Sequence, residues 1–203
     1  MSIPFRRTQE SRSAETRSRV LDATVECLIE RGYAGTTTAA VQERAGMSRG
    51  ALMHHFGSKT DLLVAAVRHL AEQRGANLVT RAAALDDSPD RTAQAIDLLW
   101  ETFTGPLFTA TLELWAASRT DDDLRVAVLG FERSLRRELD LAMVHLFGEA
   151  AASRPAFAEA IELTLQFMRG AALTTILRTD ESRQQRVIER WKSVFTSLIE
   201  EAA

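Results

Sequence analysis

The side chains best suited to bind another molecule are concentrated between Thr37 and Lys59. The guanidinium of Arg49 can donate two hydrogen bonds at once, which matches the paired acceptors that guanine exposes in the major groove of DNA. Hydroxyl and ammonium groups in the same stretch can bind phosphate oxygens. We therefore expect a contact with double-stranded DNA here, made by Thr37, Thr38, Ser48, Arg49, Gly50, Met53, His54, His55 and Lys59.

These candidates have different expected roles. Thr37, Thr38 and Lys59 are the expected phosphate ligands, and Arg49 is the expected reader of base edges. Gly50 would let the backbone approach the DNA closely. The residues expected to pack inward instead are Ala51, Leu52 and Phe56.

The histidine pair and the acidic run do not predict a metal site or a catalytic centre. Adjacent residues such as His54 and His55 point in different directions on a helix, and no carboxylate or cysteine completes a ligand set. Asp121, Asp122 and Asp123 instead indicate a helix start, where carboxylates favour the positive end of the dipole. Because we find no nucleophile with a base and no phosphate-binding loop, we expect no enzyme activity, no cofactor and no metal.

Two short helices must position the candidate DNA contact. A threonine hydroxyl in Thr36–Thr38 can start a helix that continues through Arg44. In the next turn, Gly46 can adopt the left-handed conformation, and Ser48 can cap a third helix through His54. Two short helices joined by a tight turn that contains glycine form a helix-turn-helix.

Longer helices are expected on both sides of this motif. The first covers residues 14–31 and buries Cys27, which has no histidine or lysine neighbour that would lower the pKa of its thiol. Ser58 and Asp61 can cap a fourth helix that continues to residue 81. Helical periodicity continues after a boundary at 86–89, without strand signals, and predicts an all-α fold. The later helices are expected at about 96–103, 107–118, 121–146, 155–177 and 180–200.

Composition and charge narrow the class of protein. Apolar residues make up 45% of the 203 residues and charged residues 26%, so the chain can bury a core. Residues 1–68 hold ten Lys or Arg against seven Asp or Glu, whereas the remainder holds fifteen against twenty-one. The basic first third favours a nucleic-acid contact at that end. With one cysteine, no signal peptide and no apolar run of membrane-spanning length, we expect a cytoplasmic protein without membrane contact.

The segment from Gly32 to Leu63 resembles the DNA-binding domain of TetR-family transcriptional regulators. The residues that carry the resemblance are Gly32-Tyr33, Thr36-Thr37, the run from Ala45 to Gly50, Leu52, His55-Phe56, Ser58-Lys59 and Leu62-Leu63. Two positions differ, because Gln42 replaces a small residue and Met53 replaces a tyrosine that often reaches a phosphate. The resemblance implies a helix-turn-helix domain at 1–58 and a larger helical domain for effector binding and dimerisation at 59–203.

The first residues of the chain add positive charge to the implied DNA-binding domain. Arg6, Arg7 and Arg12 can form a flexible basic arm that contacts DNA. Alternatively, they belong to a solvated terminus without a binding role.

A single short helix reads too few bases to find a site in a genome, so we expect a homodimer on a palindromic operator. The last two helices carry apolar stripes, and two helices from each subunit would form a four-helix interface. Alternatively, both stripes face the core of their own subunit. The expected interface residues are Ile161, Leu165, Met168, Ala172, Ile176, Val187, Trp191, Val194, Phe195 and Leu198.

Aromatic, leucine and methionine side chains of the middle helices are the candidates for a small-molecule pocket. The alternative, which we favour for any single one of them, is an ordinary core residue. Few polar groups accompany them, with Glu113 and His145 as the exceptions, so we expect a largely apolar effector. The expected lining residues are Trp100, Phe103, Phe108, Leu112, Trp115, Phe131, Met143 and Met168.

The sequence therefore predicts a ligand-responsive transcriptional regulator that acts as a repressor. Effector binding would shift the helix at 58–81 and change the separation of the two DNA-reading helices of the dimer. The alternative is a helical carrier of small molecules whose helix-turn-helix no longer functions.

Overall fold

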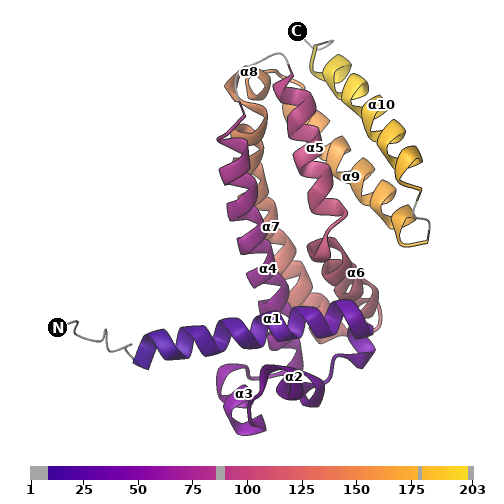
Figure 1. Ribbon diagram of the computed structural model, residues 1–203. Helices are drawn as coiled ribbons and strands as arrows, with labels where there is room; N and C mark the ends of the chain where they lie inside the picture. The colour runs from indigo at the N-terminus through magenta and orange to yellow at the C-terminus, as the bar shows by residue number, and fades with distance from the viewer. Residues whose placement is uncertain (1–8, 86–89, 178–179, 201–203) are drawn as a thin grey trace, which may run out of the picture. The chain divides into compact units, whose positions relative to one another are not determined.

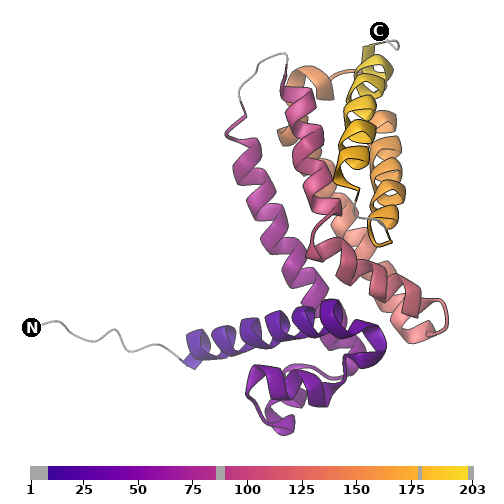
Figure 2. The same cartoon turned by 45° about the vertical axis from the view of Figure 1, so that its right-hand side comes forward.

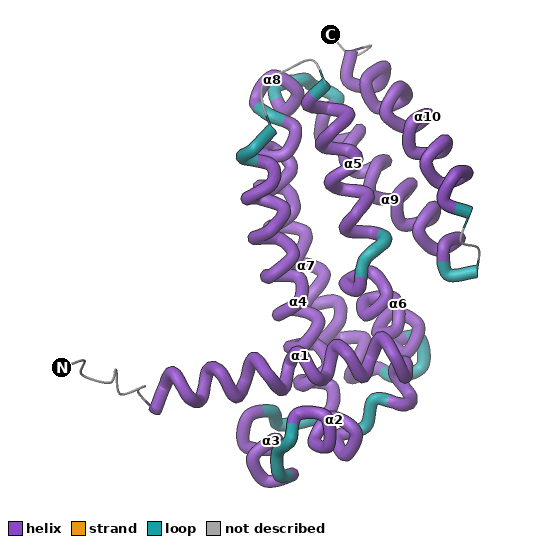
Figure 3. The backbone as a smooth tube through the Cα atoms, viewed as in Figure 1, coloured by secondary structure: helices purple, strands orange, loops and turns teal. Residues whose placement is uncertain are grey.

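The computed structural model describes residues 9–85, 90–177 and 180–200, and every regular element in these ranges is a helix (Figures 1 and 3). The all-α prediction is confirmed. The chain divides into two compact units: unit 1 lies within 1–72 and 109–132, and unit 2 lies within 73–108 and 133–203. Three helices contribute residues to both units, namely α4 (Lys59–Ala82), α6 (Pro106–Ser118) and α7 (Asp122–Phe147).

Unit 1 begins with α1 (Gln9–Gly35), which starts earlier than the predicted helix and continues past it. Its helical path is interrupted at Gly32, where φ is 67° and ψ is −178°. Cys27 is fully buried, as predicted, and this burial raises the pKa of its thiol. Two short helices follow, α2 (Thr38–Ala45) and α3 (Arg49–His55).

The core of unit 1 combines apolar residues from these helices with parts of α4 and α7. Phe131 of α7 is buried, and the guanidinium of Arg68 lies 5.5 Å from the centre of its ring. Helix α6 buries Phe108, Ala110, Thr111 and Leu114, and its other side chains are at least partly exposed. The buried apolar residues of the unit include Val20, Leu28, Val41, Leu52, Phe56, Leu63, Leu124 and Val128.

Unit 2 contains α5 (Arg91–Phe103), α9 (Phe157–Thr175) and α10 (Glu181–Glu200), which lie side by side (Figure 2). Phe147 occupies the middle of its core, with its ring centre 4.9 Å from that of Phe195 and 5.7 Å from that of Phe157. Lys192 of α10 donates to Asp97 of α5 at 2.7 Å, and this ion pair joins the two helices.

One short element of unit 2 was not expected from the sequence. Helix α8 (Glu149–Ala152) follows Gly148, which has a φ of 82°. Arg91 donates one hydrogen bond to the carbonyl of His145 at 2.8 Å and another to the carbonyl of Leu85 at 3.1 Å.

The predicted boundary at 86–89 lies outside the described residues. Within the described part of the chain, no helix has the length and apolarity that crossing a membrane requires.

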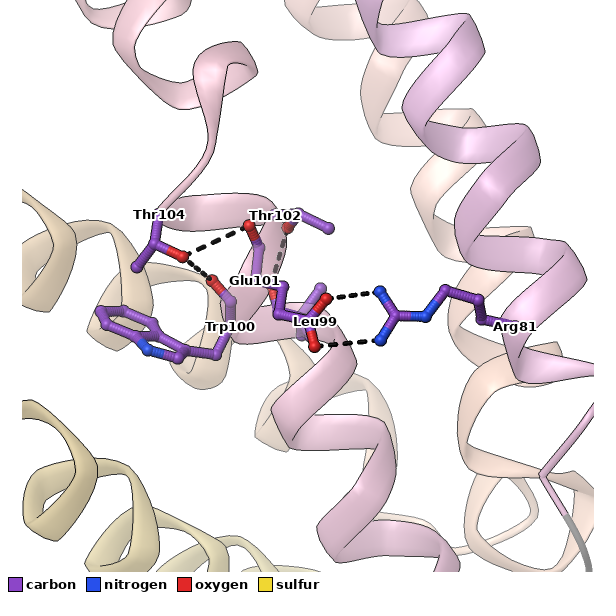
Figure 4. A network of polar contacts seen from close by, with 6 residues as sticks. All are labelled: Arg81, Leu99, Trp100, Glu101, Thr102 and Thr104. Carbon is purple, nitrogen blue, oxygen red and sulfur yellow. Dashed lines mark hydrogen bonds and ion pairs between the residues drawn. The ribbon is translucent and has the colours of Figure 1, made fainter.

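An Arg81–Glu101 ion pair joins the end of α4 to the end of α5 (Figure 4). The two guanidinium NH₂ groups donate to the two carboxylate oxygens, and the Arg81 Nη2–Glu101 Oε1 distance is 3.0 Å. The hydrogen bond from Arg81 lowers the pKa of Glu101 below its usual range. Next to this pair, the Thr104 hydroxyl donates to the carbonyl of Glu101 at 3.4 Å and helps to end α5.

We predict that Glu101→Gln removes a small, pH-dependent contribution to stability. The carboxylate has a lowered folded-state pKa, so its contribution is complete above the unfolded-state pKa and disappears as the pH falls through the folded-state value. At pH 7 the loss should be below about 1 kcal/mol, because the pair is half exposed and screened by solvent. Urea denaturation of wild type and variant at pH 7 and pH 3 measures the difference in their free energies of unfolding at each pH. Arg81→Gln should give the same pattern, and an equal difference at both pH values would contradict the prediction.

Candidate DNA-binding site

Helix α2 is fixed at both ends by specific contacts. The hydroxyl of Thr37 accepts a hydrogen bond from the backbone N–H of Ala40 at 3.1 Å, which confirms the predicted cap. In the last turn, Arg44 forms ion pairs with Glu26, at 3.4 Å, and with Glu30 of α1. The hydrogen bond from Arg44 also lowers the pKa of Glu30. These contacts hold α2 against α1.

The turn between α2 and α3 has the predicted form. Gly46 is left-handed, with φ of 64° and ψ of 41°. Its N–H donates to the carbonyl of Glu43 at 3.3 Å, and the N–H of Met47 donates to that of Gln42 at 3.1 Å. This pair of bonds is the Schellman motif. The hydroxyl of Ser48 then accepts from the N–H of Ala51 at 3.3 Å and caps α3.

Helix α3 buries one narrow stripe and exposes the rest of its surface. Leu52 is buried within the helix, and Phe56 is buried directly after its end. Ala51 is exposed, so its predicted inward position is wrong: Leu52 and Phe56 form the inward stripe, and Ala51 lies about 100° away from Leu52 on a helix. The exposed predicted contacts of this helix are Arg49, Gly50, Met53 and His54, whereas His55 is half-buried.

Sequence reasoning missed a contact at the end of α3. The guanidinium of Arg17 in α1 lies 4.6 Å from the centre of the Phe56 ring, and it donates to the carbonyl of His55 at 3.5 Å. A cation near the C-terminus of a helix is favourable because of the helix dipole. The sequence contains no signal for this contact, since Arg17 is one of several arginines on α1 and lies 38 residues before His55.

The three predicted phosphate ligands have different surroundings. Thr37 is exposed and uses its hydroxyl as the α2 cap, and Thr38 is half-buried. The Lys59 ammonium donates to the backbone carbonyl of Tyr33 at 3.1 Å and lies 4.2 Å from the centre of the Tyr33 ring. Burial lowers the pKa of Lys59. The ammonium therefore already has a partner within the protein.

The histidine pair has no metal-binding surroundings in the described part of the chain. The rings of His54 and His55 have centres 5.8 Å apart and meet edge to face. Across residues 9–85, 90–177 and 180–200, no cluster of three or more His, Cys, Asp or Glu is placed to hold a metal ion. Arg6 and Arg7 of the proposed arm lie outside the described residues, and Arg12 belongs to α1.

The predicted effector residues are divided between the units. Leu112, Trp115 and Phe131 belong to unit 1, and the other five belong to unit 2. Phe103 and Phe108 form an aromatic pair with ring centres 5.9 Å apart, whereas Met143 and Met168 are fully buried in core. A groove of about 780 Å³ in unit 2 includes only one of the eight, Trp100, beside Phe167, Gly170, Leu173 and Val187.

Two polar groups expected near a pocket have other contacts. The carboxylate of Glu113 accepts from the backbone N–H of Tyr33 at 2.8 Å, within unit 1. His145 is exposed, and its carbonyl accepts from Arg91.

The predicted dimer residues occupy two different faces of α9 and α10. Ile161, Leu165, Met168, Ala172 and Phe195 are buried within the subunit, Trp191 and Leu198 are half-buried, and Ile176, Val187 and Val194 are exposed. The half-buried Trp191 stacks on Phe167 with ring centres 4.1 Å apart. Further exposed apolar side chains were not expected from the sequence, namely Leu163 and Leu173 of α9 and Leu177 in the turn that follows α9.

This fold and this site define a transcriptional regulator of the helix-turn-helix class. Residues 20–66 match the family described as bacterial regulatory proteins, tetR family. The chain is similar to the HTH-type transcriptional regulator CymR of Pseudomonas putida, with 33% identity over 187 residues that cover 91% of each chain. The chain belongs to the TetR family of transcriptional regulators.

Solved structures share the fold. A TetR-family member from Streptomyces coelicolor A3 matches with a TM-score of 0.66 and 23% identity, over 91% of this chain and 98% of that one. A transcriptional regulator from Saccharomonospora viridis, in complex with choline, matches with a TM-score of 0.64 and 17% identity, over 92% and 96% of the two chains.

We predict that Gly46→Ala destabilises the protein, whereas Gly50→Ala does not. A Cβ would meet no atom within 4 Å at either position, so backbone conformation decides the outcome. At Gly46 the left-handed conformation should cost an alanine about 1–2 kcal/mol, while Gly50 is helical and alanine is favoured there. Urea denaturation followed by circular dichroism measures the free energy of unfolding of both variants. Equal stability changes for the two variants would contradict this account of the turn.

Proposed function

We propose that this protein is a homodimeric repressor that binds a palindromic operator and is released by a small, largely apolar effector. The observation that carries the proposal is the exposed face of α3. Its residues Arg49, Gly50, Met53 and His54 are exposed on a helix that is capped by Ser48 and anchored by Leu52 and Phe56. A short helix presented in this way can enter the major groove with its side chains free to reach base edges.

Within this proposal, Arg49 reads bases, and Gly50 permits close approach of the backbone. Thr37, Thr38 and Lys59 contact phosphates on either side of α3, and His55 makes an additional contact. Lys59 has further N–H groups besides the one that Tyr33 accepts, because an ammonium carries three donors.

The homodimer would form through α9 and α10 of each subunit. The side chains available for this contact are the exposed apolar ones, including Leu173, Leu177, Val187 and Val194. Exposed apolar groups concentrated on two neighbouring helices favour association, and two helices from each subunit form a four-helix interface.

The effector would act on the helices of unit 2 and on α4. The choline complex of the Saccharomonospora viridis relative supports binding of a small molecule by this fold. In this chain the aromatic residues Trp100, Phe103 and Phe108 favour a largely apolar ligand. The Arg81–Glu101 pair joins α5 to α4, so a ligand that moves α5 would also displace α4. Such a ligand changes the separation of the α3 helices only if it binds one arrangement more tightly.

Selection from a random pool of double-stranded DNA tests this function. The purified full-length chain should enrich sequences with two inverted half-sites, and a candidate effector should reduce binding to them. Arg49→Ala should enrich sequences with relaxed preference at one base pair of each half-site, with a loss of about 1–3 kcal/mol of discrimination there. Failure of the wild type to enrich any sequence at low salt would contradict the proposal and favour a ligand carrier.

Replacing Lys59 tests the proposed phosphate contact. Lys59→Ala should weaken binding to all sequences, and the slope of log affinity against log salt concentration should become shallower by about 0.9. The control is Arg154→Ala, which removes an exposed positive charge from unit 2 and should leave the slope unchanged. A weaker affinity with an unchanged slope for Lys59→Ala would show that Lys59 acts only by holding Tyr33.

A further inference from the structure

The turn before α2 is held by residues that lie far away in the sequence. The backbone N–H of Tyr33 donates to Glu113 Oε2 of α6 at 2.8 Å. The Tyr33 hydroxyl donates to Asp121 Oδ2 at 3.1 Å, and Asp121 Oδ1 accepts from the N–H of Leu124 at 2.9 Å. Lys59 binds the Tyr33 carbonyl at 3.1 Å. The N–H, carbonyl and hydroxyl of this one residue are therefore all bound, and all of these contacts lie within unit 1.

Gly32 makes room for the Glu113 carboxylate. Its φ of 67° and ψ of −178° break the helical path and turn the N–H of Tyr33 toward Glu113. A Cβ on residue 32 would lie only 2.9 Å from Glu113 Oε2, closer than real Cβ contacts allow. Glycine is therefore favoured here by its backbone conformation, and a Cβ would also force the Glu113 carboxylate to shift.

The position of this turn determines where α2 begins. The backbone N–H of Thr36 donates to the carbonyl of Gly32 at 3.1 Å, and the Thr36 hydroxyl donates to the same carbonyl at 2.7 Å. Thr36 is 1% exposed. The next residue, Thr37, is the N-cap of α2, and α2 leads directly into the Gly46 turn and α3. A shift of Tyr33 would therefore displace the start of the helix-turn-helix.

We propose that Glu113 is a positioning residue for DNA binding, whose carboxylate holds the turn from Gly32 to Thr36 and thereby fixes α2 and α3 for the operator. The inference rests on the proposed function. It adds a route from the effector to the DNA that does not pass through α4, because a displacement of α6 would act on Tyr33 directly. Asp121 supports the same turn from the start of α7.

The direction in which operator affinity changes when Glu113 is removed distinguishes a positioning role from a purely electrostatic effect on DNA. Glu113 carries a negative charge, and DNA is a polyanion. If Glu113 acted on DNA only through its charge, its removal would strengthen binding or leave it unchanged. If Glu113 holds the turn, its removal weakens binding to the operator.

The experiment compares Glu113→Ala and Glu113→Gln with the control Glu72→Ala in the full-length protein. Glu72 has the same charge, also lies in unit 1, and is exposed on α4 rather than bound to α6. Operator affinity is measured at one salt concentration, and amide hydrogen exchange at Tyr33 and Thr36 is measured by NMR. Thermal unfolding identifies the temperature range in which every variant is folded.

For Glu113→Ala, we expect operator affinity to fall about ten-fold or more, because a hydrogen bond to a charged group is lost. The Tyr33 amide should exchange faster by a similar factor. Glu113→Gln should show a smaller loss of both affinity and protection, since its amide oxygen can still accept the hydrogen bond. Glu72→Ala should bind the operator at least as tightly as wild type.

Unchanged or tighter operator binding by Glu113→Ala would overturn the proposal, as would an equal loss of affinity in Glu72→Ala. If Glu113→Ala does not fold, Glu113→Gln takes its place in the test. Wild-type operator affinity together with a wild-type exchange rate of the Tyr33 amide in Glu113→Gln would then overturn the proposal. If the wild type binds no selected DNA, the proposed function fails, whereas faster Tyr33 exchange in the variants would still show that Glu113 holds the turn.

Discussion

The structure of this regulator depends on holding a seven-residue helix in one orientation. Helix α3 is too short to be stable by itself. In an isolated helix of this length, the few backbone hydrogen bonds do not offset the conformational entropy lost in forming the first turn. Its orientation therefore comes from its surroundings. Leu52 and Phe56 anchor it in the core of unit 1, Ser48 caps its start, and Arg17 binds the carbonyl of His55 at its end. The exposed side chains are thereby presented on a fixed surface.

The orientation of α3 also depends on the contacts that hold α2, the helix that precedes it. Arg44 pairs α2 with α1, and the turn before α2 is bound by Glu113, Asp121 and Lys59 through Tyr33. These groups come from α6, the start of α7 and the start of α4. Because α4, α6 and α7 continue into unit 2, the helices that would respond to an effector are covalently continuous with those that position α2 and α3. In the proposed function, this continuity is the physical route by which an effector would act on DNA binding.

Local features of the site could be predicted from the sequence, whereas contacts between distant residues could not. The Thr37 and Ser48 caps and the left-handed Gly46 follow from residue types within a few positions of one another. The bond between Tyr33 and Glu113 joins residues 80 positions apart, and nothing in their types specifies it. Periodicity identified apolar stripes on α9 and α10 but not what covers them, so buried Phe195 and exposed Val194 were placed in one expected interface.

The most direct test of the account is protection of guanine N7 from methylation on a selected operator bound by the full-length protein. N7 lies in the major groove, where α3 is proposed to insert. The account predicts two clusters of protected guanines, one in each half-site, on the same face of the duplex and about one helical turn of 10–10.5 base pairs, or a multiple of it, apart. Binding without N7 protection, or with a single protected cluster, would contradict it.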